Sequence, residues 1–272
     1  KSVSRGLGDV YKRQIKNAGV KSGEVVTIMA PNIPEMFEAH FGVAMAGAVL
    51  NTLNTRLDTD TIAYILEHAD TRLLITDAAF GEAMKTALAQ TKNKKIKIID
   101  IIDQQASESV SGLRLGEQDY ETFLNGADPD YKWQMPADEW QAMCLNYTSG
   151  TSGRPKGVVY HHRGAYLMAM GTIPVWNMPM HPTYLYVVPL FHCNGWGHAW
   201  MMAIVAGTTI CCRKIIAEDI YPLITDHKVT HFGGAPIVLS MLVNAPDDVI
   251  KKPEHTVNIM TAGAPPPAAL LE

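Results

Sequence analysis

Residues 147–157 carry the side chains of this chain that are best suited to binding phosphate. They read Tyr-Thr-Ser-Gly-Thr-Ser-Gly-Arg-Pro-Lys-Gly, with apolar residues on both sides, so the sequence predicts a loop between two strands. Glycines allow backbone amides to approach an anion, hydroxyl groups donate further hydrogen bonds, and Lys156 adds a mobile positive charge. The pattern indicates a phosphate-binding loop, and a flexible hairpin loop is the plainer alternative.

Two well-known functional loops do not match these residues. A Walker A loop requires Ser or Thr directly after its lysine, whereas Gly157 follows Lys156. A nucleophile elbow requires Gly-x-Ser-x-Gly, and neither Ser149 nor Ser152 has glycines two residues away on both sides. The sequence therefore favours a nucleotide-binding loop of another type.

A second group of residues whose side chains could take part in binding or catalysis follows a predicted strand at 184–188. The segment that begins at Pro189 reads Pro-Leu-Phe-His-Cys-Asn-Gly-Trp, and Gly195 permits a tight turn within it. Ligands in α/β folds bind at the carboxyl ends of strands, so we predict that His192 faces a ligand. A metal site formed by His192, its neighbouring cysteine and His198 is disfavoured, because neither Cys-x-x-Cys spacing nor a nearby carboxylate supports it.

Strand and helix patterns alternate along the chain from residue 15 onward. Asn32 and Pro34 suit the first turn of the first long helix, with Asn32 as its cap. Residues 104–131 are polar and are predicted to form a surface excursion. Strands are predicted at 25–29, 49–50, 73–76, 97–102, 184–188, 208–212 and 257–261, with a strand and then a turn within 229–236. The alternation predicts an α/β fold with mostly parallel sheets flanked by helices.

Composition excludes several classes of protein. The 272 residues have a formal net charge of −4, which gives no support to nucleic-acid binding. The longest apolar run, at about residues 196–212, is interrupted by His198, glycines and threonines and falls short of a membrane span. Four cysteines are too few for a disulfide framework. We therefore expect a cytoplasmic protein without a membrane span.

Residues 1–14 differ from the rest of the chain. Their apolar residues do not recur at the spacing of a helix or of a strand. Residues 4–14 also resemble translated adaptor sequence. We predict that residues 1–14 are a non-native scar and that residues 15–272 form part of one domain. A genuine surface segment is the alternative for residues 1–14.

The loop and the histidine segment also carry a family resemblance. The run from Tyr147 to Val158 resembles the phosphate loop of the adenylate-forming enzymes, which include acyl-CoA synthetases, luciferases and peptide-synthetase adenylation domains. The usual family string has Thr where this chain has Ser152, and a hydroxyl is retained. Pro-Leu-Phe-His-Cys-Asn-Gly is similar to a second family motif. The resemblance implies an incomplete large N-terminal domain of such an enzyme, with its C-terminal domain absent.

This resemblance implies roles for the matching residues. Thr148 matches the hydroxyl that contacts Mg²⁺, and His192 would orient the reacting carboxylate. Trp196 matches the gate tryptophan of fatty acyl-CoA synthetases, and a core aromatic residue is its alternative. The implied phosphate contacts are Thr148, Ser149, Gly150, Thr151, Ser152, Gly153 and Lys156. The implied acyl-pocket residues are Gly233, Gly234 and Ala235, and the implied adenine contacts are Gly263, Ala264 and Pro265. Simple turns are the alternative for these last two groups.

The activity that the resemblance implies is ATP-dependent activation of a carboxylic acid, first to an acyl-adenylate and then to an acyl-CoA. ATP, Mg²⁺ and coenzyme A would take part. The motifs resemble those of bacterial fatty acyl-CoA and 3-methylmercaptopropionate–CoA ligases, so fatty acids and short thioether acids are both open as substrates. His192 stands where amino-acid-activating domains usually carry Asp, which disfavours amino acids. A homodimer of the full-length parent is also open.

Family motifs that belong to the second half of such an enzyme do not occur in this sequence. They are Tyr-Gly-x-Thr-Glu, Thr-Gly-Asp and a late catalytic lysine. We therefore expect a fragment that is inactive by itself. The competing hypothesis is a non-catalytic nucleotide-binding fragment, and carboxylate-dependent pyrophosphate exchange would separate an enzyme from a binder.

Overall fold

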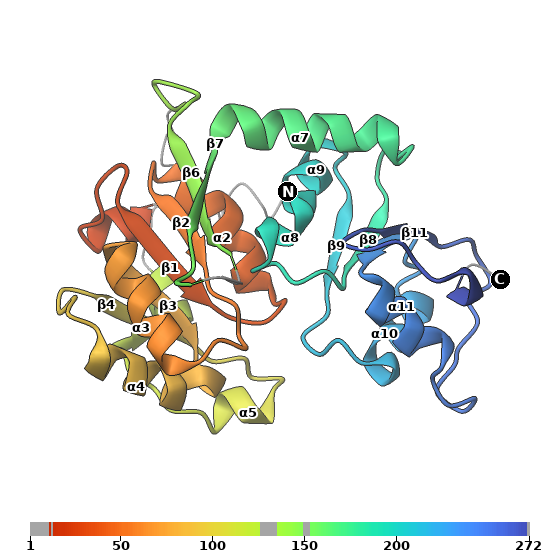
Figure 1. Cartoon of the computed structure of the whole chain (residues 1–272), viewed down its shortest axis with the longest axis horizontal. Helices are drawn as coiled ribbons and strands as arrows, with labels where there is room; N and C mark the ends of the chain where they lie inside the picture. The colour runs from red at the N-terminus through yellow and green to blue at the C-terminus, as the bar shows by residue number, and fades with distance from the viewer. Residues whose placement is uncertain (1–10, 12, 126–134, 149–152, 271–272) are drawn as a thin grey trace. The chain divides into compact units, whose positions relative to one another are not determined.

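The chain folds into two compact units in a computed structural model (Figure 1). Unit 1 comprises the residues up to Ala30 and from Glu35 to Ala165, and unit 2 comprises Pro31–Pro34 and the residues from Tyr166 onward. The structure describes residues 11, 13–125, 135–148 and 153–270. Each unit has its own sheet and its own hydrophobic core.

Unit 1 is built on a seven-stranded sheet with the strand order β5-β4-β3-β1-β2-β6-β7. Its strands are β1 (Val25–Met29), β2 (Val49–Thr52), β3 (Thr71–Asp77), β4 (Lys97–Ile101), β5 (Gln118–Asp119), β6 (Ala142–Tyr147) and β7 (Gly157–His161). Its helices are α2 (Pro34–Met45), α3 (Thr59–His68), α4 (Gly81–Gln90), α5 (Ser107–Val110) and α6 (Tyr120–Leu124), with a 3-10 turn η1 (Ala78–Phe80). Neighbouring strands are parallel, except that β7 runs antiparallel to β6. The predicted fold class is confirmed.

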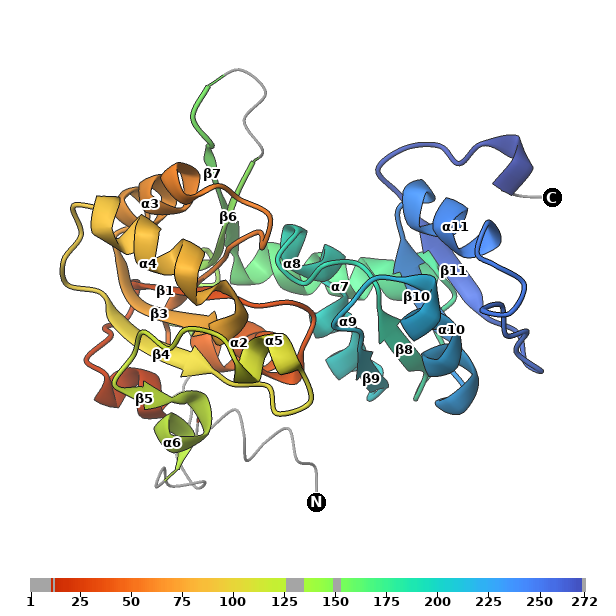
Figure 2. The ribbon, with the colours of Figure 1, turned by 90° about the horizontal axis from the view of Figure 1, so that it is seen from below.

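The composition of β1 explains its central place in this sheet. All five of its residues, Val-Val-Thr-Ile-Met, are buried, as expected for a parallel strand that has helices on both faces. Right-handed crossovers place α2 on one face and α3 and α4 on the other, where these two helices lie side by side (Figure 2). Apolar side chains of α3 and α4, including Ile62, Leu66 and Met84, pack with Leu74 of β3 in one core cluster. This core fixes α3 against the sheet.

Unit 2 contains a four-stranded parallel sheet with the order β11-β10-β8-β9. Its strands are β8 (Thr183–Tyr186), β9 (Thr208–Cys211), β10 (His231–Gly234) and β11 (Asn258–Thr261). Its helices are α8 (Cys193–Trp196), α9 (His198–Ile204), α10 (Ala217–Asp226) and α11 (Pro236–Val243), with most of α7 (His162–Val175) and a 3-10 turn η2 (Ala268–Leu270). None of the helices that the structure describes is long and apolar enough to cross a membrane.

Successive side chains of β8 point to opposite faces of the second sheet. Leu185 packs with Phe232 in a cluster that includes apolar residues of α10 and α11. Successive strand residues face opposite sides, so Tyr184 and Tyr186 point away from that cluster. The Tyr184 hydroxyl lies 2.7 Å from Nδ1 of His198 in α9. One face therefore carries an aliphatic core, and the other carries an aromatic cluster.

Asn32 does not cap α2, so that prediction was wrong. Its side chain is buried in unit 2, where Nδ2 donates to the carbonyl oxygens of Tyr186 at 2.9 Å and Val188 at 3.1 Å. Its Oδ1 accepts from the amide of Leu190 at 2.7 Å. Preferences for helix caps describe only local partners, whereas these partners are distant in sequence. Asn32 ties down the segment between β8 and His192.

Two segments contain more regular structure than the sequence predicts. Residues 104–131 include α5, β5 and α6, and Asp119 caps α6 by accepting from the Thr122 amide at 2.8 Å. Gly233 and Gly234, for which a simple turn was the alternative to an acyl pocket, are the last residues of β10. Glycine is tolerated within a strand where another group approaches closely, and the indole of Trp196 does so at Gly233.

Most of residues 1–14 lie outside the described part of the chain. Tyr11 is described and is buried, with its ring 5.7 Å from that of Tyr120, centroid to centroid. It also packs so closely on Gly42 that a Cβ atom there would overlap the Tyr11 ring. The native or non-native origin of residues 1–14 stays a prediction.

Candidate functional site

The predicted phosphate loop connects β6 to β7 in unit 1, as the sequence predicted. The two strands pair up to Tyr147 and Gly157, and the Thr148 amide donates to the carbonyl oxygen of Lys156 at 3.0 Å. The Lys156 amide in turn donates to Oγ1 of Thr148 at 3.3 Å. We call Tyr147 and Thr148 the entry stem and residues 154–156 the exit stem. The predicted contacts Ser149, Gly150, Thr151 and Ser152 lie outside the described residues.

The described parts of the loop present exposed polar groups. Thr148, Arg154 and Lys156 are exposed, and Gly153 has a φ of 146°, which side chains rarely allow. Nothing lies within 4 Å of the position that a Cβ atom would take at Gly153. The loop can therefore offer cations and backbone amides to an anion without rearranging a packed core.

Thr148 also fits the implied magnesium contact. Its hydroxyl oxygen accepts one hydrogen bond, from Lys156, and retains a second lone pair. Mg²⁺ prefers oxygen ligands and often takes several of them from substrate phosphates and water. Within the described ranges, no group of three or more His, Cys, Asp or Glu side chains could hold a metal.

His192 lies on an exposed turn after β8 in unit 2. Its amide donates to the carbonyl oxygen of Pro189 at 3.0 Å, and its own carbonyl accepts from the Gly195 amide at 3.0 Å. The Cys193 Sγ lies 3.9 Å from Nε2 of His192. The backbone is thus held on both sides of His192, while its side chain is exposed.

The five residues that follow His192 form a left-handed turn. The φ angles of Cys193, Asn194, Gly195, Trp196 and Gly197 are 48°, 52°, 58°, 56° and 69°. A left-handed conformation costs on the order of 1–2 kcal/mol for each residue other than glycine. Such strain persists where the surroundings determine it, and Asn194 and Gly195 are buried. The turn sets the direction in which Trp196 leaves the backbone.

Trp196 borders an apolar pocket of about 410 Å³ in unit 2. The other lining residues include Met168, Thr172 and Val175 of α7, His198 of α9 and Met260 of β11. Gly233 lies behind the indole, because a Cβ atom there would stand 3.2 Å from Cζ3 of Trp196. The structure thus brings together Trp196 and one of the three predicted acyl-pocket residues.

His198 is the main polar side chain of this pocket. It is 2 % exposed and bonds to the Tyr184 hydroxyl, and its ring contacts those of Trp196 and Trp176. Burial lowers the pKa of His198 to about 4, so the imidazole is neutral at neutral pH. The pocket therefore presents no positive charge from this residue.

The remaining predicted contacts are placed differently. A Cβ atom at Gly234 would approach Leu239 and Val238 rather than Trp196, and Ala235 caps α11. Neither residue lines the pocket that Trp196 borders. Gly263 has a φ of 93° and stands in open space, and Ala264 and Pro265 are exposed. They follow Ala262, which does line the pocket.

A family model described as AMP-binding enzyme matches residues 13–272. The chain belongs to the AMP-binding enzyme family. It is 46% identical over 266 residues to a peroxisomal acetate/butyrate–CoA ligase of Arabidopsis thaliana, covering 94% of this chain and 47% of the relative. It is 45% identical over 262 residues to a 2-methylpropanoate–CoA ligase of Humulus lupulus, covering 94% and 46%. The chain spans about half the length of the curated relatives it matches. The resemblance to adenylate-forming enzymes is confirmed.

Solved structures agree with this assignment at the level of the fold. The N-terminal domain of FACL13 from Mycobacterium tuberculosis, in an inhibitor-bound crystal structure, superposes with a TM-score of 0.83 at 23% identity. That match covers 97% of this chain and 63% of the FACL13 domain. A benzoate CoA ligase from Burkholderia xenovorans LB400 gives a TM-score of 0.83 at 19% identity, covering 98% and 51%.

The sequence did not reveal three groups of residues that contact predicted site residues or the segments that carry them, in one unit or the other. Asn32 holds the segment before His192, Tyr184 bonds to His198, and Tyr64 and His68 of α3 contact the stems of the phosphate loop. Tyr64 and His68 are four residues apart, so a shared helix face could have been predicted. The sequence does not say which element that face meets.

Proposed function

We propose that this chain is the nucleotide-binding part of an AMP-forming acyl-CoA synthetase that activates a carboxylic acid. The observation that carries the proposal is the Gly/Ser/Thr loop with Lys156 between β6 and β7, in a chain that matches the AMP-binding enzyme family over residues 13–272. The named CoA ligases among its relatives give further support.

The proposed reaction has two steps. In the first, a carboxylate oxygen attacks the α-phosphorus of ATP; the bond from that phosphorus to the bridging oxygen breaks, and pyrophosphate leaves with the electron pair. In the second, the thiol of coenzyme A loses its proton and attacks the acyl carbon, and AMP leaves. Two anions must meet in the first step, so neutralisation of charge is the main requirement.

Residues of the loop would meet this requirement. Lys156 and the loop amides would bind the phosphates that leave as pyrophosphate, and Thr148 would contact Mg²⁺. The metal supplies charge neutralisation across phosphate oxygens when it is bound. His192, exposed on a turn whose backbone is held on both sides, would orient the carboxylate. The exposed Gly263, Ala264 and Pro265 would pack against adenine.

The proposed substrate is an aliphatic acid, and short-chain and short thioether acids are the first to test. The pocket at Trp196 is apolar and of limited volume, about 410 Å³, and the rings of Trp196 and His198, which contact each other, form part of its lining. Relatives named for acetate, butyrate and 2-methylpropanoate support a short acid. Fatty acids are the alternative, and activity with acids of increasing chain length would distinguish them from short acids.

Carboxylate-dependent exchange of pyrophosphate into ATP tests the proposal. The complete protein is expected to catalyse exchange with at least one acid of an aliphatic panel. Nucleotide binding without exchange for any acid would favour the alternative, a non-catalytic nucleotide-binding protein. The 272-residue chain by itself is expected to show no exchange.

We also propose that the complete protein is cytoplasmic. A homodimer of the complete protein is a further possibility that can be tested separately. The four cysteines, all within the described residues, form no disulfide, which suits a reducing compartment. A fluorescent fusion of the complete protein would report its compartment, and light scattering would report its mass in solution.

A further inference from the structure

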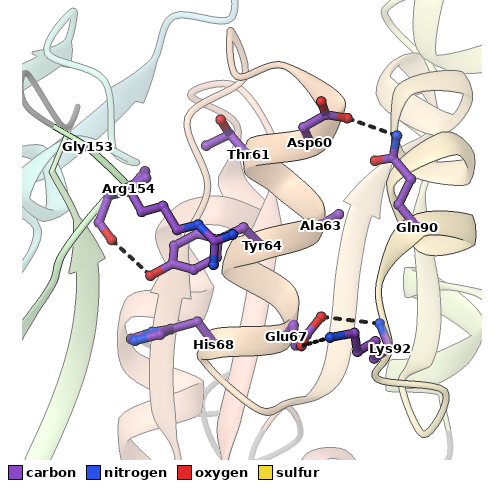
Figure 3. A pocket seen from close by; sticks show the side chains of 11 residues that line it. Asp60, Thr61, Ala63, Tyr64, Glu67, His68, Gln90, Lys92, Gly153 and Arg154 are labelled. Carbon is purple, nitrogen blue, oxygen red and sulfur yellow. Dashed lines mark hydrogen bonds and ion pairs between the residues drawn. The ribbon is translucent and has the colours of Figure 1, made fainter.

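Helix α3 contacts both stems of the phosphate loop through one face. Tyr64 and His68 are separated by one helical turn and point to the same side, where α3 borders a pocket of about 880 Å³ (Figure 3). Their rings contact each other with centroids 5.3 Å apart. The same pocket is lined by Gly153, Arg154 and Pro155, so the helix face and the end of the loop share a surface.

Tyr64 holds the exit stem in two ways. Its hydroxyl donates to the carbonyl oxygen of Pro155 at 3.3 Å. The guanidinium carbon of Arg154 lies 5.2 Å from the centroid of the Tyr64 ring, within the range of a cation–π contact. Figure 3 shows Arg154 lying over this ring. A single side chain of α3 therefore restrains two consecutive residues next to Lys156.

His68 holds the entry stem. Its Nδ1 lies 2.7 Å from the hydroxyl of Tyr147, and the two rings meet edge to face with centroids 5.7 Å apart. Tyr147 is half-buried, and burial is the main cause that raises its pKa to about 12. The Tyr147 hydroxyl therefore keeps its proton at neutral pH and remains available for the hydrogen bond.

α3 is itself well anchored. Asp58 caps its first turn by accepting from the Thr61 amide at 2.8 Å. Ile62, Ile65 and Leu66 are buried in the core beneath the helix. The two stems are thus tied to a rigid element, in addition to the hydrogen bonds between Thr148 and Lys156.

We propose that Tyr64 and His68 are positioning residues that hold the two stems of the phosphate loop in the geometry for binding the phosphates of ATP. The proposal rests on the proposed function for its catalytic consequence. Donors that stabilise a charged transition state are effective when they are already oriented, because no reorganisation is then required during reaction. A helix face that fixes both stems would provide this orientation.

Hydrogen exchange tests the holding of the stems without any ligand. The amides of Thr148 and Lys156 are followed by NMR in the complete protein, without nucleotide or acid. Tyr64→Ala and His68→Ala are expected to speed their exchange about tenfold, since local opening is favoured when restraints are lost. Tyr64→Phe, which keeps the ring and removes the bond to Pro155, is expected to give a smaller increase. If Tyr64→Ala does not fold, Tyr64→Phe still tests the proposal, because it keeps the ring in place.

Kinetics of the complete protein test the consequence. Tyr64→Ala is expected to raise the KM for ATP about tenfold, because a hydrogen bond and a cation–π contact are lost. The KM for the acid should stay the same. Gln90→Ala is the matched control: Gln90 lines the same pocket and bonds to Asp60, not to the loop.

The outcomes separate this proposal from the proposed function. Unchanged amide exchange in Tyr64→Ala would overturn the positioning role, and so would faster exchange with an unchanged KM for ATP. If the wild-type complete protein shows no pyrophosphate exchange with any acid, the proposed function fails. Amide exchange at Thr148 and Lys156 then still decides whether α3 holds the stems.

Discussion

At the scale of single residues, Lys156 is one of two exposed cations, with Arg154, at the end of the phosphate loop. Its backbone is fixed by two hydrogen bonds to Thr148, whereas its ammonium group is accessible. Because the backbone of Lys156 is fixed and its side chain is flexible, the ammonium group can follow the phosphates as charge develops during the reaction.

Lys156→Ala in the complete protein is expected to slow adenylation by on the order of 10²-fold and to raise the KM for ATP. Initial rates of pyrophosphate exchange at several ATP concentrations would measure both effects. Lys252→Ala, an exposed lysine of unit 2, serves as the control. Unchanged kinetics would remove Lys156 from the site.

Trp196 is a second residue whose role can be measured. Trp196→Ala removes the indole that borders the pocket and lies against Gly233. We expect relative kcat/KM to shift toward longer acids by about fourfold for each added methylene, since each buried methylene is worth about 0.8 kcal/mol. A series of straight-chain acids measures the shift, and Trp140→Ala in unit 1 is the control. The same acid preference in both variants would make Trp196 a plain core residue.

Burial of His198 predicts a dependence of stability on pH. Its pKa falls from an ordinary value of 6.5 to about 4 in the folded state, because of desolvation. Between these values His198 binds more protons in the unfolded chain, so the contribution of His198 to the free energy of unfolding falls as the pH drops from about 6.5 to about 4. The loss due to this residue is on the order of 3 kcal/mol.

Urea unfolding of the chain at several pH values would measure this slope. Burial also lowers the pKa of His231, and it raises the pKa of Glu35 to about 7, which changes stability in the opposite direction, so the wild-type slope has more than one source. His198→Gln is the variant that isolates the contribution of His198. Equal slopes for the wild type and this variant would show that His198 is not the source.

At the scale of elements, two tethers join distant segments of the chain. Within unit 1, α3 contacts both stems of the phosphate loop. Within unit 2, Asn32 bonds to three backbone groups between the end of β8 and Leu190. In both cases a polar side chain fixes a segment that carries predicted site residues.

Asn32→Asp tests the second tether. An aspartate loses both donated hydrogen bonds and places a carboxylate against the carbonyl oxygens of Tyr186 and Val188. We expect a loss of about 2–4 kcal/mol in the free energy of unfolding. Chemical denaturation measures it, with the exposed Asn244→Asp as the control. Equal stability of the two variants would contradict the tether.

At the scale of the whole molecule, the chain exposes apolar side chains that globular proteins usually cover. Tyr166, Leu167, Met170 and Val175 of α7 are exposed, and Val175 is 83% exposed. The chain also spans about half the length of its curated relatives. Uncovered apolar surface of this kind favours self-association.

We expect the 272-residue chain to associate in a concentration-dependent manner, and Leu167→Glu with Val175→Glu to reduce this association. Light scattering over a range of protein concentrations would measure it. Substituting glutamate for the exposed Lys251 and Lys252 is the matched control on another surface. A monodisperse wild-type chain would show that α7 does not drive association.

The sequence by itself determined the elements and the motifs whose signals are local. The strand β1 has the predicted bounds, and the loop between β6 and β7 lies where the Gly/Ser/Thr run predicts it. Local composition suffices there, because β-branched runs favour strands and glycine-rich runs interrupt them. The family, too, was evident from the loop and the His192 segment.

Only the tertiary structure decided which segments meet. Asn32 suits a helix cap by its type, yet its partners lie beyond residue 185. Gly233 belongs to a strand against Trp196 rather than to a turn, and Tyr64 reaches Pro155 across the unit. Side-chain preferences describe neighbours along the chain, whereas these contacts are fixed by strand order and by the faces on which the helices pack.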